Sequence, residues 1–204
     1  MKDVSPTEDG GGPETSGFAG DGGGRSDVCE RRHVYLVGFM GAGKSTVGRL
    51  LAQKLGRRWV DMDAEIGREA QKSVAAIFAA EGEEGFRRRE AELLARLAEE
   101  PSPLVVSTGG GVVLRRENRE RLRASGVVVY LEVPFSDLWK RLTEFGGSSD
   151  RPLFAPGDAE ALRRRLRARE ALYREVADLV YVNLDTPERA ALDLAGTLRS
   201  FLQR

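Results

Sequence analysis

The sequence predicts an α/β protein in which five parallel strands form one sheet with helices on both faces. Three observations carry this prediction. Five short runs rich in Val and Leu alternate with segments whose apolar residues recur at helical spacing. The runs are apolar at successive positions, as expected of strands buried on both faces. A glycine-rich segment joins the first run to the first helical segment.

The elements follow in order from residue 33. Strands are predicted at 33–38, 57–61, 103–107, 126–133 and 178–184. Helices are predicted over 47–55, around 74–80 and 83–99, over 117–125, from 134 onward, over a long Arg-rich stretch ending near 176, and over 186–202. The last helix should begin with Thr186 as its N-cap and Pro187 in its first turn.

The 204 residues allow one domain with a sizeable core, which we place at 33–204. Residues 1–32 are rich in Gly, Asp, Glu, Ser and Thr and contain few large apolar groups. Burial cannot offset the entropy of ordering such a segment, so it is predicted to be a disordered tail. A docking role for the tail is the alternative.

Composition excludes several classes of function. Lys plus Arg and Asp plus Glu are both 32, which argues against a dedicated nucleic-acid binder. One cysteine permits no internal disulfide and no cysteine cluster for a metal. No apolar run approaches the roughly 20 residues of a membrane span, and no apolar signal segment is seen at the start. We therefore expect a cytoplasmic protein without a membrane or nucleic-acid partner.

The segment "GFMGAGKST" at 38–46 has the spacing of a phosphate loop, G-x-x-x-x-G-K-[ST]. Its glycines let backbone N–H groups surround a phosphate, and the helix that follows presents its positive N-terminus. Lys44 is expected to reach the β- and γ-phosphates, and Ser45 to offer a hydroxyl to Mg²⁺. The loop alone leaves motor, switch and kinase open. The predicted ATP-binding residues here are Gly41, Ala42, Gly43, Lys44, Ser45 and Thr46.

Two carboxylates, Asp61 and Asp63, follow the second strand. If the backbone stays extended there, both face the same way at the sheet edge where ligands bind in open α/β folds. One could organise Mg²⁺ while the other takes a substrate hydroxyl proton. A helix N-cap is the alternative reading.

Arg87 lies on the flank of an apolar stripe in the helix predicted over 83–99, and Glu90 falls on the stripe at i, i+3. A guanidinium fixed by a carboxylate is well suited to bind a substrate carboxylate. Arg88 and Arg89 are expected in surface ion pairs.

The third strand runs directly into Gly109, Gly110 and Gly111. Three glycines in a row are expected where a ligand must touch backbone, although a tight turn is the alternative.

A loop at about 145–158 contains one strong cation, Arg151, and is predicted to be a mobile lid that closes over a phosphoryl donor. A surface loop with a solvated Arg is the alternative. In the next helix Arg169 falls on the inward stripe, where it needs a partner or a water-filled cleft. The off-stripe arginines are expected to be solvated: Arg163, Arg164, Arg165 and Arg167.

Taken together, "GFMGAGKST", "DMD", "FRRRE", "STGGG", "DRPLF" and "RARE-ALYREVA" occur in the order found in shikimate kinases. From about Val34 to Leu202 the chain resembles this family, which has a three-layer α/β/α P-loop kinase fold. The resemblance implies transfer of a phosphoryl group from ATP to the 3-hydroxyl of shikimate, with Mg²⁺, in the pathway to chorismate and the aromatic amino acids. We expect a monomer.

The resemblance also implies roles for single residues. Asp63, Lys44 and Arg151 would be catalytic, and Asp61 would share Mg²⁺ with Ser45 through water. The adenine would lie by Arg141. The residues that the resemblance places around shikimate are Asp63, Arg87, Gly109, Gly110, Gly111 and Arg169. Gly67 stands where the family commonly has Glu, and this departure is expected to affect local packing only.

Two other functions remain open at this level. A different small-molecule kinase on the same fold, such as one resembling gluconate kinase, would share the phosphate loop. A non-catalytic nucleotide-binding module would require decay of Asp63, Lys44 or the lid, and all are intact in the sequence.

Overall fold

The computed structural model describes residues 33–144 and 158–202. Within them, the strands form one sheet with the order β2-β3-β1-β4-β5, and every neighbouring pair is parallel. This confirms the predicted fold class. The strands are β1 (His33–Val37), β2 (Arg58–Asp61), β3 (Leu104–Ser107), β4 (Gly126–Glu132) and β5 (Leu179–Val182).

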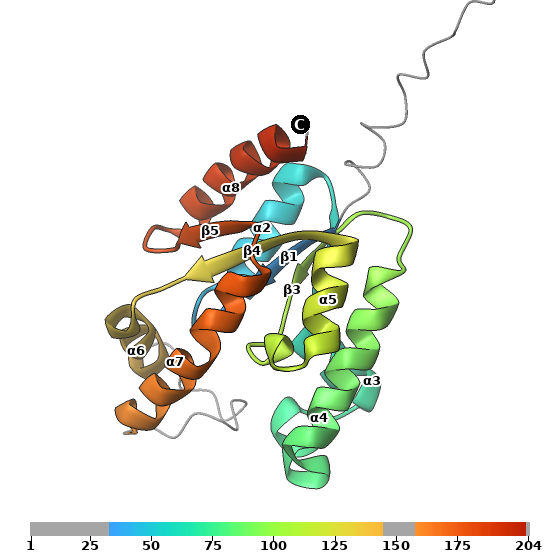
Figure 1. The fold of residues 1–204 in the computed structure, drawn as a ribbon, viewed down its shortest axis with the longest axis vertical. Helices are drawn as coiled ribbons and strands as arrows, with labels where there is room; N and C mark the ends of the chain where they lie inside the picture. Colours follow the sequence, from blue (N-terminus) through green and yellow to red (C-terminus); the bar gives the residue numbers. More distant parts are fainter. Residues whose placement is uncertain (1–32, 145–157, 203–204) are drawn as a thin grey trace, which may run out of the picture.

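Helices cover both faces of this sheet. Figure 1 shows α2 and α8 on one face and α5 and α7 on the other. The helices are α2 (Lys44–Leu55), α3 (Met62–Ala70), α4 (Val74–Ala98), the short 3-10 helix η1 (Val112–Leu114), α5 (Arg116–Ser125), α6 (Phe135–Glu144), α7 (Ala159–Val176) and α8 (Pro187–Leu202).

The central strands are buried along their whole length. Every residue of β1 and β3 is buried, and β4 is buried up to its last residue. No polar–apolar alternation occurs in them, because helices exclude water from both faces. The apolar runs that predicted the strands therefore mark the core directly.

The segment after β2 differs from the prediction. The backbone does not stay extended, because α3 begins at Met62 and Asp61 is its N-cap. The Asp61 carboxylate accepts hydrogen bonds from the N–H groups of Asp63 and Ala64 at 3.1 and 3.2 Å. The N-cap alternative is thus correct for Asp61, and the helix itself was not predicted. Capping outweighs extension here because it satisfies two otherwise orphaned donors.

Two other predicted boundaries are confirmed. Gly82 has non-helical φ and ψ of 70° and −178°, so α4 consists of two helical stretches that meet at this kink. At the start of α8, the Thr186 hydroxyl accepts the N–H of Arg189 at 3.3 Å.

Three predictions lie outside the described residues: the tail at 1–32, Arg151, and the lid apart from its last position. That position, Asp158, is the N-cap of α7 and accepts the N–H of Ala161 at 2.8 Å. Gly67 lies in α3, and a β-carbon there would approach only the carbonyl of Lys72, at 3.1 Å. Among the helices of residues 33–144 and 158–202, none combines the length and the apolar composition that a membrane span requires.

A chain of hydrogen bonds ties α2 to β3. The indole of Trp59 donates to the Ser107 hydroxyl at 3.0 Å, and this hydroxyl donates to the carbonyl of Lys44 at 2.8 Å. Gly48 makes the contact possible, because a β-carbon there would overlap the Ser107 hydroxyl. The start of the phosphate-loop helix is therefore held directly on the end of β3.

Replacing this glycine should be destabilising. Gly48→Ala would force Ser107 to turn and lose both bonds, which should lower the free energy of unfolding by about 1–3 kcal/mol. Gly196→Ala is the matched control, because Gly196 lies in α8 with nothing within 4 Å of its added β-carbon. The control should gain about 0.5–1 kcal/mol from helix propensity. Urea unfolding measures both, and equal stabilisation by the two variants would contradict this account.

Candidate active site

A pocket of about 770 Å³ lies at the carboxyl edge of the sheet. It is lined by the phosphate loop, the start of α3, α4, the loop after β3, α7 and the loop after β5. Twelve of the predicted site residues line it: Gly41, Gly43, Lys44, Ser45, Thr46, Asp61, Asp63, Arg87, Gly110, Gly111, Arg141 and Arg169. Ala42 and Gly109 are buried beside it. The structure therefore brings together residues that the sequence places 128 positions apart, between 41 and 169.

The phosphate loop has the backbone that its glycines predict. Gly41 and Gly43 have φ of 80° and 89°, a left-handed conformation that favours glycine. Lys44 is buried, and its amine donates to the carbonyls of Gly38 and Phe39 at 2.9 Å each. The N-terminus of α2 and the lysine charge thus face the same pocket, which is an arrangement that attracts phosphate.

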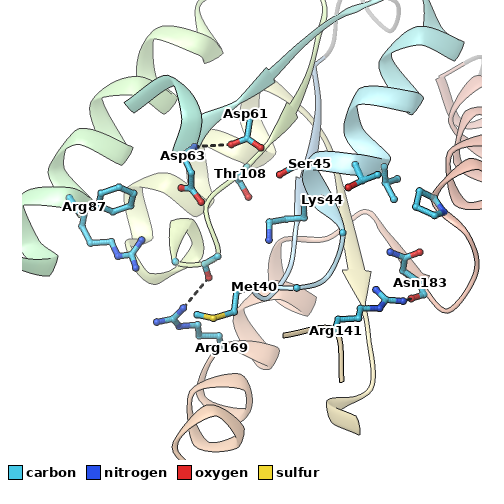
Figure 2. A pocket seen from close by; sticks show the side chains of 18 of the residues that line it. Met40, Lys44, Ser45, Asp61, Asp63, Arg87, Thr108, Arg141, Arg169 and Asn183 are labelled. Carbon is cyan, nitrogen blue, oxygen red and sulfur yellow. Dashed lines mark hydrogen bonds between the residues drawn. The ribbon is translucent and has the colours of Figure 1, made fainter. Parts of the chain in front are cut away.

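Two carboxylates face this pocket from the start of α3, where Asp63 stands in the first turn. Figure 2 shows Asp63, Arg87 and Arg169 on one side of Lys44, with Arg141 and Asn183 on the other. Asp61 and the exposed Ser45 bring oxygen donors to the pocket. A carboxylate and a hydroxyl are oxygen donors that fit a Mg²⁺ held largely by phosphates and water.

Arg87 and Glu90 form the buried ion pair expected from their spacing. Nη1 of Arg87 donates to Glu90 at 2.9 Å, and Nη2 donates to Glu83 at 3.2 Å. Burial lowers the pKa of Arg87, but the charge of Glu90 and the bonds to both carboxylates outweigh it and raise the pKa. Burial raises the pKa of the Glu90 carboxyl to about 7, against the opposing effect of Arg87. Arg87 therefore stays charged although it is buried.

The glycine triplet makes room for these side chains. A β-carbon at Gly109 would overlap the carboxylates of Glu90 and Asp63, and one at Gly111 would overlap the guanidinium of Arg87. Gly110 has more space, with its nearest neighbour at 3.4 Å. The triplet is therefore more than a tight turn, because two of its glycines admit charged side chains of the pocket.

Arg169 reaches the triplet from α7. It is 8% exposed, donates to the carbonyl of Gly110 at 3.3 Å, and lies 5.8 Å from the ring centre of Phe39. On the opposite side of the pocket, Arg141 donates to the backbone carbonyl of Asn183 at 2.8 Å. The four off-stripe arginines of α7 are exposed, as predicted.

Sequence reasoning missed several residues that line the pocket. Asn183 is buried, and its amide donates to the carbonyl of Ala42 in the phosphate loop at 2.8 Å. Its position directly after β5 is a usable signal, since strand ends face the ligand in parallel sheets. The other lining residues that were not predicted to belong to the site are Met40, Val47, Phe78, Phe86, Thr108, Asp185 and Pro187.

The sheet order, the phosphate loop and the charged residues that share its pocket define a P-loop kinase that acts on a small molecule. The shikimate kinase family model matches residues 40–199. Known shikimate kinases are similar over most of the chain, so the chain belongs to the shikimate kinase family.

Two relatives and two solved structures show the range of similarity. The shikimate kinase of Symbiobacterium thermophilum is 45% identical over 84% of this chain and 96% of its own length. That of Bordetella pertussis is 42% identical over 84% of this chain and 77% of its own length. The structure of shikimate kinase from Acinetobacter baumannii in complex with shikimate has a TM-score of 0.78 and 38% identity, covering 86% of this chain and 98% of that one. A gluconokinase from Sinorhizobium meliloti, at TM-score 0.56 and 21% identity over 85% of this chain and 97% of that one, shares the fold alone.

Burial of Glu90 should be visible in the pH dependence of stability. The pKa rises from 4.5 to about 7 on folding, so between these values the folded protein holds a proton that the unfolded chain releases. Wild type should therefore lose stability relative to Glu90→Gln as pH rises toward 7, and the difference should level off above it. Urea unfolding of both proteins from pH 5 to 8 measures this difference, in which the titrating groups that are not coupled to Glu90 cancel. A difference that is constant with pH would contradict the assignment.

Proposed function

We propose that this chain transfers the γ-phosphoryl group of ATP to the 3-hydroxyl of shikimate, giving shikimate 3-phosphate and ADP. In the cell this reaction would serve the pathway to chorismate and the aromatic amino acids. Membership of the shikimate kinase family supports the reaction. The observation that carries it in this chain is the pair of buried arginines beside the glycine triplet.

The pair Arg87 and Arg169 gives the acceptor half of the pocket its chemistry. Both guanidiniums are largely buried, and both contact the triplet, Arg87 at Gly111 and Arg169 at Gly110. A planar guanidinium binds a carboxylate through two parallel bonds, and burial strengthens such bonds. We therefore assign the shikimate carboxylate to these two arginines, with the backbone of Gly109–Gly111 against the ring.

Asp63 is assigned to the reacting hydroxyl. It lines the pocket between the arginines and Lys44, as Figure 2 makes visible. A carboxylate there can accept the proton of the hydroxyl and orient its oxygen toward the donor phosphate. Catalysis of phosphoryl transfer depends mainly on such positioning.

The donor half is assigned to the phosphate loop and Arg141. The residues Gly41 to Thr46 would surround the phosphates, Lys44 would neutralise charge on the transferred group, and Arg141 would lie by the adenine. Ser45 and Asp61, the latter through water, would hold Mg²⁺. When bound, Mg²⁺ supplies positive charge that offsets the charge of the phosphate oxygens. The role predicted for Arg151 stays a prediction, as do a monomeric state and a cytoplasmic location.

An acceptor panel tests the proposal directly. ADP release is followed with ATP, Mg²⁺ and one acceptor at a time: shikimate, gluconate or a nucleoside monophosphate. Shikimate alone should stimulate release. Stimulation by gluconate instead would favour the other small-molecule kinase on this fold. Tight ATP binding with no stimulation by any acceptor would favour a non-catalytic nucleotide-binding module.

Neutralising Asp63 should remove most turnover. Asp63→Asn keeps the size of the side chain but cannot take a proton, so kcat with shikimate should fall at least about 100-fold. Binding of a fluorescent ATP analogue should be unchanged, because the phosphate loop is intact. Near-normal kcat in this variant would sink the assignment of Asp63.

Replacing a planar cation by a point charge should weaken acceptor binding. Arg169→Lys should raise KM for shikimate about 10-fold, because an ammonium cannot form two parallel bonds. Arg167→Lys is the matched control, since Arg167 lies on the same helix and is exposed. Equal KM values for both variants would show that Arg169 does not bind the acceptor.

A further inference from the structure

We propose that Tyr173 is a positioning residue of the acceptor pocket: its hydroxyl holds the carbonyl of Gly110 and so leaves Arg169 available for the carboxylate of the acceptor. This inference rests on the proposed function, because it concerns the same pocket. It goes beyond that function by assigning a role to a side chain that the sequence pattern places in the core of α7.

Tyr173 is fully buried, and its hydroxyl contacts both the Gly110 carbonyl and the Arg169 guanidinium. Its hydroxyl donates to the carbonyl of Gly110 at 2.5 Å, and the residue is 0% exposed. Burial raises the pKa of Tyr173, so the hydroxyl keeps its proton and remains a donor. The ring stacks on Tyr130 of β4, with centroids 5.2 Å apart. The hydroxyl is thus fixed in place by the packing of the ring.

Arg169 competes for the same carbonyl. It stands four residues before Tyr173, so both side chains leave the same face of α7. Its bond to the Gly110 carbonyl is longer than that of Tyr173, at 3.3 Å. Figure 2 marks this bond with the dashed line from Arg169. A carbonyl has two lone pairs and a guanidinium has five N–H donors. The carbonyl is therefore satisfied mainly by Tyr173, and most of the Arg169 donors remain for another acceptor.

Loss of the Tyr173 hydroxyl would change which side chain satisfies the Gly110 carbonyl. The Gly110 carbonyl would then depend on Arg169, because these two side chains are its donors among the described residues. A half-buried carbonyl that loses its main donor seeks another, so the guanidinium would be drawn onto it. Arg169 would have to give up this bond to bind a carboxylate, and the affinity for the acceptor would fall.

The effect should stay local. The turn after the triplet is held separately by α5, where Asn118 donates to the carbonyl of Val112 at 3.0 Å and Arg119 to that of Val113 at 2.9 Å. No hydrogen bond joins Tyr173 to Lys44 or Arg141 in the described contacts. Loss of the hydroxyl should therefore leave ATP binding in the donor half of the pocket unchanged.

The test compares Tyr173→Phe with Tyr35→Phe. Tyr35 is the matched control, since it is also fully buried and its hydroxyl bonds Ser125 at 2.8 Å. Tyr173→Phe should raise KM for shikimate about 3- to 10-fold, the size expected of one lost hydrogen bond. Its kcat and its KM for ATP should stay within about twofold of wild type, because the lost bond lies outside the reacting groups and the ATP half of the pocket. Tyr35→Phe should leave all three unchanged, with a similar loss of thermal stability.

A double-mutant cycle separates positioning from general damage. If Tyr173 acts through Arg169, Tyr173→Phe should raise KM for shikimate less in the Arg169→Lys background than in wild type. An unchanged KM in the single variant, equal changes for both substrates, or the same factor in both backgrounds would overturn the inference. If wild type releases no ADP in response to shikimate, the proposed function itself fails, and this inference fails with it.

Discussion

The position of β3 between β2 and β1 is the constraint on which the pocket depends. Parallel pairing sets Asp61 beside Ser107, and Ser107 beside Leu36, at one edge of the sheet. The segments that follow these three strands therefore lie side by side at this edge: the start of α3, the glycine triplet and the phosphate loop. Backbone hydrogen bonds fix their spacing, and the bonds of Ser107 to Trp59 and to the start of α2 lock it further. The distance between the donor and acceptor halves is thus built into the sheet.

Charge is concentrated where this edge meets the helices, and glycine makes that possible. Burying Arg87 is costly unless a carboxylate accompanies it, and Glu90, fully buried, supplies that partner. The absence of side chains at Gly109 and Gly111 lets the pair lie against the backbone. Burial raises the pKa of the Glu90 carboxyl to about 7, and ionisable groups with shifted pKa values gather at functional sites.

Much of this could be predicted from sequence because local patterns carry it. Apolar runs predicted the positions of the strands, and the i, i+3 spacing predicted the ion pair between Arg87 and Glu90. The helix stripe showed that Arg169 faces inward. Helix α3 was not predicted, although Met62 and Ile66 lie four residues apart and are both buried, which is a helical signal. The two aspartates were instead interpreted as lying on extended backbone. The contact of Asn183 with Ala42 spans 141 positions and depends on the sheet order, which no local pattern contains.

The central claim is that one pocket joins donor and acceptor, so that the phosphoryl group passes directly to the 3-hydroxyl of shikimate. The most direct measurement is the product itself, followed by ³¹P and ¹H NMR while the chain turns over ATP, Mg²⁺ and shikimate. This account predicts one shikimate 3-phosphate for each ADP, and negligible ADP without shikimate. Inorganic phosphate formed in step with ADP, or phosphate on a different hydroxyl, would contradict it.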